Sequence, residues 1–358
     1  MNPELFELDS VVQWPDSNNC TPFPGFTEKS ALKPEVLTPP VRSLSFNVTC
    51  PFAHEESFSK SDSQNDENYS NRFSVSTTFG PKADWHSHLP DITLVSLDSL
   101  AFYVHSHTLL AASENAFGSL LPTTSFDANL VIRVPESSAM LNIILRAVYH
   151  MPFSEYHSFE DLSGAVGLLP VYGVRPKSYI LRDTHLYMLL LSYSPTLPLK
   201  VYTLAAKHDL EDLAVSTSSH LLSFNLSTLS DETAEAVGSE YLRRLFFLHI
   251  GRLDALKRLL LQPPSSHPPT DHCGASGQKA LTRVWALASA YLAWDSRPDL
   301  STNLLESTFA PLIKDLSCEI CTENLNTRIK DLSFQWSQVK VRHHYCGLDS
   351  NVGSSFHH

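Results

Sequence analysis

Residues 91–113 read DITLVSLDSLAFYVHSHTLLAAS, and this stretch decides the fold. Residues 91–96 alternate polar with apolar or β-branched side chains, a pattern typical of a half-buried strand. Asp98 and Ser99 indicate a turn, and a second β-rich run follows at residues 101–105. The two runs predict an antiparallel hairpin, and short helices are predicted after it at residues 108–113 and 116–121, where Pro122 stops them.

The next segments predict one more strand and then mostly helices. Residues 130–134 (LVIRV) form a third strand, and Pro135 opens a helix with Met140, Ile144 and Val148 on one face. Apolar residues recur at helical spacing in residues 159–172, 186–191 and 199–222. A three-stranded sheet followed by helices predicts an α+β domain.

The order of these elements, and several residues in them, resemble the BTB/POZ domain. The family pattern is an Asp-led strand, then F-x-V-H-[basic]-x-x-L-x-A-x-S, then a strand and a helix that ends in Tyr. In this chain that helix ends at Tyr149, and residues 201–222 (VYTLAAKHDLEDLAVSTSSHLL) look like the closing helices of the family. The remaining matching positions are Asp91, Phe102, Val104, His105, Leu109, Ala111 and Ser113.

The resemblance covers residues 88–223, and we place a BTB/POZ-like domain at residues 86–225 with an insertion around 155–198. It is most similar to the large BTB group of mushroom-forming fungi. It implies a three-stranded sheet with helical hairpins that forms homo- or hetero-dimers through its first strand and first helices. Ser106 stands where many members carry a Lys or Arg that lines a charged pocket at the dimer interface, so we expect weak homodimers.

Residues 1–85 have a different composition, rich in Pro, Ser, Asn and acidic residues. Residues 57–78 (SFSKSDSQNDENYSNRFSVSTT) show no sustained apolar period. Such a segment cannot bury enough apolar surface to offset its ordering entropy. We therefore predict that residues 1–85 form a mostly disordered tail and that residues 1–80 are dispensable for folding.

Residues 226–345 predict an all-α C-terminal domain, followed by a tail at residues 346–358. Apolar residues recur at helical spacing in residues 241–261, 278–294, 303–316 and 323–341. A proline-rich linker at residues 263–269 separates the first two of these helices. Three of the five tryptophans are predicted to lie in the core of this domain, because each falls on an otherwise apolar helix face: Trp285, Trp294 and Trp336.

Cys318 and Cys321 form a Cys-x-x-Cys pair between two predicted helices, where the chain can turn both thiolates toward one point. His272 and Cys273 stand at the exit of the proline-rich linker. These four residues predict one structural zinc site of the closed Cys3His type. Rival ligands are His343, His344 and Cys346. Reduced thiols without a metal are the alternative interpretation, and redox chemistry is disfavoured because no βαβ pattern surrounds the pair.

His86 with His88, and His105 with His107, form two His-x-His pairs. Alternate residues on a strand share a face, so such a pair can bind a metal. A metal-dependent hydrolase with Asp84 or Asp91 as its base is therefore a remote alternative. We favour a structural role for His105 because the family pattern accounts for it.

Composition narrows the function further. The chain has 358 residues and a formal net charge of −12, which disfavours a nucleic-acid partner. It contains neither a Gly-rich phosphate-binding motif nor a Ser nucleophile elbow. The N-terminus does not resemble a signal peptide, and no apolar run is long enough for a membrane span. We expect an intracellular protein of the nucleus or cytoplasm with reduced cysteines.

Together these features predict a non-enzymatic scaffold or adaptor that binds protein partners and no membrane. One narrower alternative is a substrate adaptor of a cullin ubiquitin ligase, as some BTB proteins are, although no kelch or MATH repeat is visible. Another is a transcriptional regulator, although no array of C2H2 fingers is present.

Overall fold

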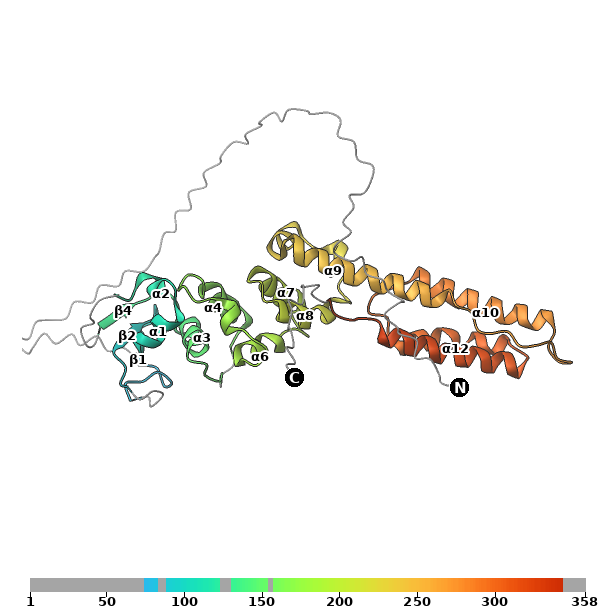
Figure 1. Ribbon diagram of the computed structural model, residues 1–358, viewed down its shortest axis with the longest axis horizontal. Helices are drawn as coiled ribbons and strands as arrows, with labels where there is room; N and C mark the ends of the chain where they lie inside the picture. Colours follow the sequence, from blue (N-terminus) through green and yellow to red (C-terminus); the bar gives the residue numbers. More distant parts are fainter. Residues whose placement is uncertain (1–73, 83–87, 123–129, 154–156, 344–358) are drawn as a thin grey trace, which may run out of the picture. The chain divides into compact units, whose positions relative to one another are not determined.

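The computed structural model describes residues 74–82, 88–122, 130–153 and 157–343 (Figure 1). In this part of the chain the strands form a mixed sheet in the order β1-β3-β2-β4. Their bounds are β1 (Ser74–Val75), β2 (Ile92–Val95), β3 (Leu100–Val104) and β4 (Leu130–Arg133). β2 and β3 form the predicted antiparallel hairpin, which pairs Leu94 with Phe102. β4 runs parallel to β2, and β1 runs parallel to β3.

Helices lie between β3 and β4 and after β4, and they make the fold α+β, as the sequence predicts. Their bounds are α1 (Ser106–Ala112), α2 (Ala116–Ser119), α3 (Ser138–Val148), α4 (Phe159–Leu168), α5 (Pro176–Tyr179), α6 (His185–Ser192), α7 (Pro198–Lys207) and α8 (Glu211–Ser218). Side-chain caps explain several of the starts, because Ser137, Ser158 and Thr184 each accept a backbone N–H of the helix that follows. Short 3-10 turns lie at Ser219–Leu221, Leu226–Thr228 and Leu312–Asp315.

The first core is one hydrophobic cluster that joins the sheet to α1–α8. Phe79 belongs to it with a fully buried side chain, and its ring lies 6.1 Å from that of Phe102 and 5.4 Å from that of Tyr149. The composition of residues 1–85 predicts that residues 74–79 belong to the tail. The structure corrects this boundary, because β1 adds a fourth strand to the predicted three and Phe79 fills the core beside it.

The long helix α9 (Asp231–Leu260) contributes to both hydrophobic cores of the described residues. It is interrupted at Gly238, whose backbone has φ 76° and ψ 158°. Around this point Val237, Tyr241 and Leu245 belong to the first core. The last turns of α9, with Leu256, belong to the second core.

The second core is the cluster between the end of α9 and three further helices, α10 (Ala275–Trp294), α11 (Thr302–Phe309) and α12 (Glu319–Gln338). Trp285 and Trp336 are buried in it, as predicted. The prediction for Trp294 is wrong, because its side chain is 92% exposed. Trp294 is the last residue of α10 and lies off the face that carries Leu281, Ala288 and Leu292 into the core.

After α12 the chain returns to the first core. The His343 backbone N–H donates to Ser218 Oγ at 3.3 Å, and His343 Nε2 lies 3.1 Å from the Tyr202 hydroxyl. The same hydroxyl donates to the Tyr241 carbonyl on α9 at 2.8 Å. Tyr202 therefore binds the chain where it leaves the first core and where it comes back.

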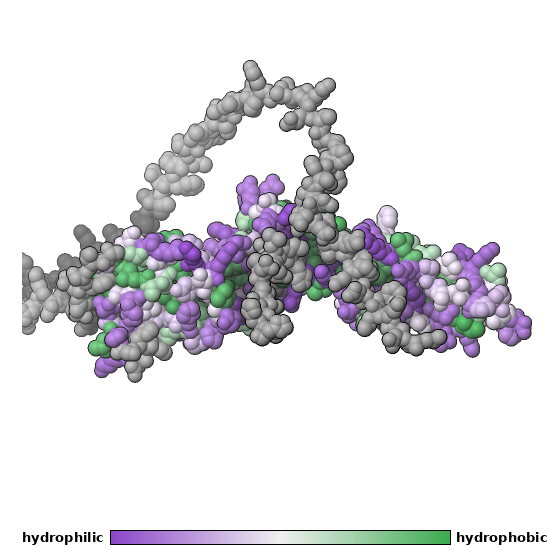
Figure 2. Space-filling model, in the orientation of Figure 1, coloured by the Kyte–Doolittle hydropathy of each residue, from purple (hydrophilic) through white to green (hydrophobic). Residues whose placement is uncertain are grey.

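On the face that Figure 2 shows, hydrophobic residues of the described segments are scattered among hydrophilic ones. None of the described helices is both long and apolar enough to cross a lipid bilayer.

Candidate metal centre

The proline-rich linker between α9 and α10 brings two ligand residues to one place. Proline lacks a backbone N–H and resists helix, so residues 262–274 form an irregular segment rather than a continuation of α9. Near its end, Thr270 and Cys273 exchange backbone hydrogen bonds of 3.0 and 3.1 Å, which close a tight turn. The turn holds Cys273 beside Gly274, the N-cap residue of α10.

The start of α12 supplies the other two thiols. Cys318 is the N-cap residue of this helix, and Cys321 lies in its first turn. This explains the value of the Cys-x-x-Cys spacing, because one helical turn places both side chains on the same side.

The four groups converge. His267 Nε2 lies 3.2 Å from Cys321 Sγ and 3.5 Å from Cys318 Sγ, and Cys273 Sγ lies 3.7 Å from Cys321 Sγ. All four ligand atoms lie within 4.8 Å of one another. A tetrahedral zinc ion with ordinary bond lengths would separate two sulfurs by about 3.7 Å and a sulfur from a nitrogen by about 3.5 Å. These three separations are therefore close to the corresponding edges of a ZnS3N tetrahedron.

The described residues contain one such group of metal-ligating side chains. It includes three of the four residues predicted from the sequence, Cys273, Cys318 and Cys321. It does not include His272, whose side chain is exposed. His267 is the fourth member of the group. His272 lies inside the turn that Thr270 and Cys273 close, and its side chain is exposed there, whereas His267 precedes the turn. Of the rival ligands, His343 lies against Tyr202 in the first core, and residues 344 and 346 lie outside the described part of the chain.

The surroundings hold the ligand atoms in place. His267 Nδ1 lies 2.7 Å from the Pro268 carbonyl, a contact in which the ring N–H donates and leaves Nε2 directed at the thiols. The Gln278 side-chain amide donates to the His267 carbonyl. Asn324 donates to the Ser265 carbonyl at 3.0 Å, and Arg328 donates to the Gln262 carbonyl at 3.0 Å. Side chains of α10 and α12 thus fix the linker backbone along its length.

Burial and hydrogen bonding give the three thiols different pKa values. Burial raises the pKa of Cys321 to about 12, and it also raises the pKa of Cys273. A hydrogen bond from the backbone of Cys321 lowers the pKa of Cys318 to about 7. Cys318 is also the only one of the three thiols that is half-buried rather than buried. Without a cation the cluster stabilises one thiolate, and a divalent metal would be needed to hold three.

Four protein ligands close the site, so there is no open position for a substrate or a catalytic water. The arrangement is therefore that of a structural centre, compatible with zinc, and not of a catalytic one.

The His-x-His pairs do not form a comparable group in the described residues. His105 Nε2 lies 2.9 Å from the His88 carbonyl, and its Nδ1 lies 3.1 Å from the Tyr149 hydroxyl. Asp91 accepts the Ser106 backbone N–H at 2.7 Å at the start of α1. These contacts serve the fold of the hairpin and the first helix. Asp84 and His86 lie outside the described residues.

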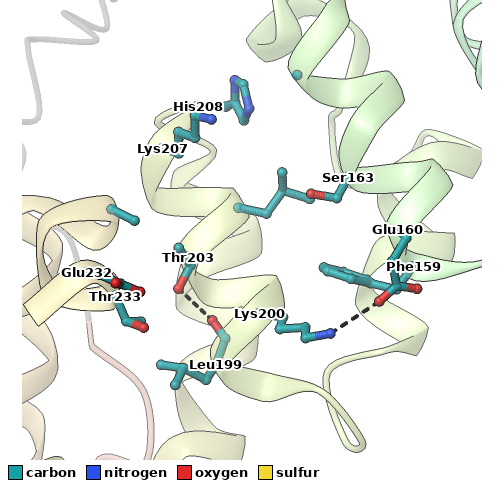
Figure 3. Close-up of a pocket in the computed structure, with 13 residues that line it drawn as sticks. Phe159, Glu160, Ser163, Leu199, Lys200, Thr203, Lys207, His208, Glu232 and Thr233 are labelled. Carbon is teal, nitrogen blue, oxygen red and sulfur yellow. Dashed lines mark hydrogen bonds and ion pairs between the residues drawn. The ribbon is translucent and has the colours of Figure 1, made fainter. Parts of the chain in front are cut away.

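A separate open groove of about 580 Å³ lies between α4, α7 and the first turns of α9 (Figure 3). At its edge Lys200 pairs with Glu160 at 3.2 Å. The remaining charged residues of its wall, Lys207 and Glu232, also balance. This lining selects no ligand charge, so we assign the candidate site to the thiol cluster.

Comparison with known proteins adds no family assignment. A scan against protein-family models finds no match for this chain, and a search of the curated proteins finds no similar sequence.

Proposed function

We propose that this chain is a non-enzymatic protein–protein interaction scaffold or adaptor whose residues 86–225 associate as a BTB/POZ-like module. The observation that carries this proposal is the strand arrangement. The hairpin β2–β3 is followed by α1 and α2, and β4 then returns parallel to β2 on the side away from β3. The family resemblance in the sequence implies the same sequence of hairpin, helices and returning strand.

The burial of the matching residues supports the proposal. Phe102, Val104 and Leu109 are fully buried in the first core. His105 and Tyr149 bind each other through two contacts, one of which is the His105 backbone N–H donating to the Tyr149 hydroxyl at 2.8 Å. These five of the matching residues therefore stabilise the junction of the sheet and the helices.

The pairing of Asp91 with Ser106 supports weak self-association. Ser106 donates to both carboxylate oxygens of Asp91, from its backbone N–H and from its hydroxyl. Asp91 is thus bound within its own chain, where the resemblance would place a basic residue instead of Ser106. We propose that the module forms weak homodimers or pairs with a related domain of different sequence. Cullin adaptor and transcriptional regulator are narrower forms of the same function, which the identity of the partner would separate.

Light scattering on the full chain tests this association. Ala111 is exposed on α1, so Ala111→Glu places a charge on the proposed interface without disturbing the core. We expect the variant to shift the average mass toward the monomer at concentrations where the wild type associates. Met188→Glu, at an exposed position on α6, is the matched control and should not change the mass. An effect of equal size in both variants, or none in either when the wild type associates, would contradict the proposed module.

We further propose that the thiol cluster binds one structural zinc ion, and its Cys3His geometry is the observation that carries this. Elemental analysis of the purified protein should find close to one zinc per chain. Cys321→Ser and His267→Ala should lose the metal, whereas His272→Ala should retain it. Purified protein without stoichiometric metal, or equal loss in the two histidine variants, would overturn the ligand set.

A further inference from the structure

Of the three thiols in the candidate metal centre, Cys318 is the one that solvent reaches. Cys273 and Cys321 are buried, whereas Cys318 is half-buried. An open hollow of about 450 Å³ is lined by Cys318, by residues of α12 and by the segment just before this helix. Its lining includes neither Cys273 nor Cys321. A small solute in this hollow therefore meets Cys318 first.

The wall of the hollow favours a small neutral solute. Among the described residues, two acidic side chains, Glu319 and Glu323, line it against one basic side chain, Lys330. This excess of negative charge disfavours anionic oxidants such as oxidised glutathione. Hydrogen peroxide carries no charge and is small, so it is the thiol oxidant that suits the hollow best.

A second thiol stands beside Cys318 on the same helical turn. Cys318 is the N-cap residue of α12, and Cys321 lies in the first turn. Residues three apart on a helix are neighbours at about 5–6 Å, and a disulfide joins residues whose Cα atoms lie about 4.4–6.8 Å apart. Their sulfurs belong to the group whose ligand atoms all lie within 4.8 Å of one another. A disulfide between Cys318 and Cys321 would thus form without moving α10 relative to α12.

We propose that Cys318 is an oxidation site for hydrogen peroxide, that Cys321 converts the product to a disulfide, and that the metal is released as a result. This inference rests on the proposed zinc centre and assigns its regulation. The Cys-x-x-Cys pair is then the target of an oxidant and not the centre of a redox enzyme.

The reaction takes two steps. The Cys318 thiolate attacks one peroxide oxygen, the O–O bond breaks, and the other oxygen leaves as hydroxide and takes up a proton to become water. The Cys321 thiolate then attacks the sulfur of the resulting sulfenic acid, an S–S bond forms, and the departing hydroxide is also protonated to water. The two sulfurs lose two electrons in total, and the peroxide gains them.

The disulfide removes two of the metal ligands. Cys273 and His267 remain, and two ligands do not hold a structural zinc ion, which requires four. The link between the linker, α10 and α12 is then lost, so oxidation should loosen the second core. Because a thiol reductant cleaves the disulfide, the change is reversible.

Peroxide treatment of the full chain, purified with its zinc, tests the proposal. A chromogenic chelator reports released zinc, dimedone traps the sulfenic acid, and peptide mass spectrometry locates the dimedone and the disulfide. We expect release of the zinc, dimedone on Cys318, and a disulfide between Cys318 and Cys321 that dithiothreitol reverses. Oxidised glutathione at the same concentration should release zinc more slowly by about tenfold or more.

Histidine substitutions remove one thiol each while keeping a fourth ligand for the metal. Cys318→His should retain zinc and slow its release by peroxide by about tenfold or more, because the accessible thiol is gone. Cys273→His is the matched control, since it also replaces one thiolate, and it should release zinc about as fast as the wild type. The dimedone pattern of the wild type decides the site even where a variant fails to fold.

The outcomes separate this inference from the metal centre on which it rests. Dimedone on Cys273 or Cys321 before Cys318, a disulfide that involves Cys273, or equal release rates in the two histidine variants would overturn the assignment. Zinc that stays bound under peroxide overturns the oxidation and leaves the proposed metal centre intact. Protein purified without zinc overturns the metal centre itself, and this inference with it.

Discussion

At the scale of single residues, Gly277 shows how closely the backbone surrounds the candidate metal centre. It is the third residue of α10, and a Cβ atom built there would lie 2.5 Å from Cys273 Sγ. No real side chain tolerates that separation. The thiol of Cys273 can therefore point at the other ligands only because position 277 has no side chain.

Gly277→Ala should weaken metal binding although it introduces a better helix former. The methyl group forces Cys273 Sγ to move, and we expect zinc affinity to fall by about tenfold or more, in line with other changes beside the ligands. Competition with a chromogenic chelator measures this. Gly274→Ala is the control, because a Cβ there meets no atom within 4 Å. Equal affinities in the two variants would show that the space beside Cys273 is not needed.

Buried His249 on α9 predicts a pH dependence of stability. Its Nε2 has no hydrogen-bond partner within the described residues, and burial lowers the pKa of its imidazole. The unfolded chain, with a histidine pKa near 6.5, then binds more protons than the folded chain as the pH falls below that value. Stability from this residue is therefore present above about pH 6.5 and is lost as the pH falls toward the lowered folded pKa.

Thermal unfolding between about pH 7.5 and about pH 5.5 tests the role of His249. His249→Gln removes the titrating group, so its melting temperature should fall less over this interval than that of the wild type. His272→Gln, at an exposed position, should lose as much as the wild type. A wild-type slope in both variants would mean that other groups control the acid sensitivity.

The exchange of His272 for His267 shows where sequence reasoning reached its limit. Cys318 and Cys321 could be paired from sequence because their Cys-x-x-Cys spacing lets a turn of the chain direct both thiolates to one point, although the structure forms that turn as the start of α12 rather than as a connection before it. The choice between two histidines five residues apart depended on the turn at residues 270–273, which no local pattern determined. His272 was predicted because it directly precedes Cys273 in the sequence. The proline pair at 268–269 directly after His267 was the available signal that the chain would hold that residue extended.

At the scale of elements, α9 is the helix whose interruption the sequence did not reveal. The periods of α10 and α12 were readable because their buried residues recur at spacings of three and four over many turns. The predicted helix begins at residue 241, so the prediction missed the first turns of α9 from Asp231 and the break at Gly238, whose φ of 76° and ψ of 158° belong to a backbone region that only glycine occupies readily. The break lets the first turns of α9 and its main part take different directions while both contribute to the first core.

Gly238→Ala should destabilise the protein by about 1–3 kcal/mol through backbone strain alone. The space around this position is open, so a clash is not a competing explanation. Gly167→Ala is the opposite case, since Gly167 lies within α4 with equally open surroundings, and should stabilise by about 0.5–1 kcal/mol. Urea unfolding measures both changes. Two changes of the same sign would contradict this account of Gly238.

At the scale of the whole molecule, the two cores rest on different kinds of interaction. The first core joins a sheet to many helices, whereas the second is built from few helices with the candidate metal centre at one end. Two buried arginines assist it. Arg252 stacks 4.2 Å from the Trp336 ring and donates to the Pro298 and Val339 carbonyls, and Arg328 donates to the Leu259 carbonyl.

Removal of the metal should therefore loosen the second core selectively. Trp285 and Trp336 are buried there, so chelation should shift tryptophan emission to the red. It should also lower the temperature at which the second core unfolds. Trp294 is already exposed and should contribute no shift. The Cys321→Ser variant should show the shifted emission before chelation and no change after it. A response to chelator in that variant would place the metal elsewhere.

The bonds of Tyr202 to both Tyr241 and His343 have a consequence for the architecture of the chain. The segment that leaves at Tyr241 comes back to the same hydroxyl about a hundred residues later, so the helices of the second core form an excursion from the first. When the two ends of a segment lie close together in the fold, replacing that segment by one of another length changes the loop-closure entropy only slightly. The helices of the second core are thus an insertion between two neighbouring points of the first core. They could be lengthened, replaced or excised while the first core keeps its connectivity.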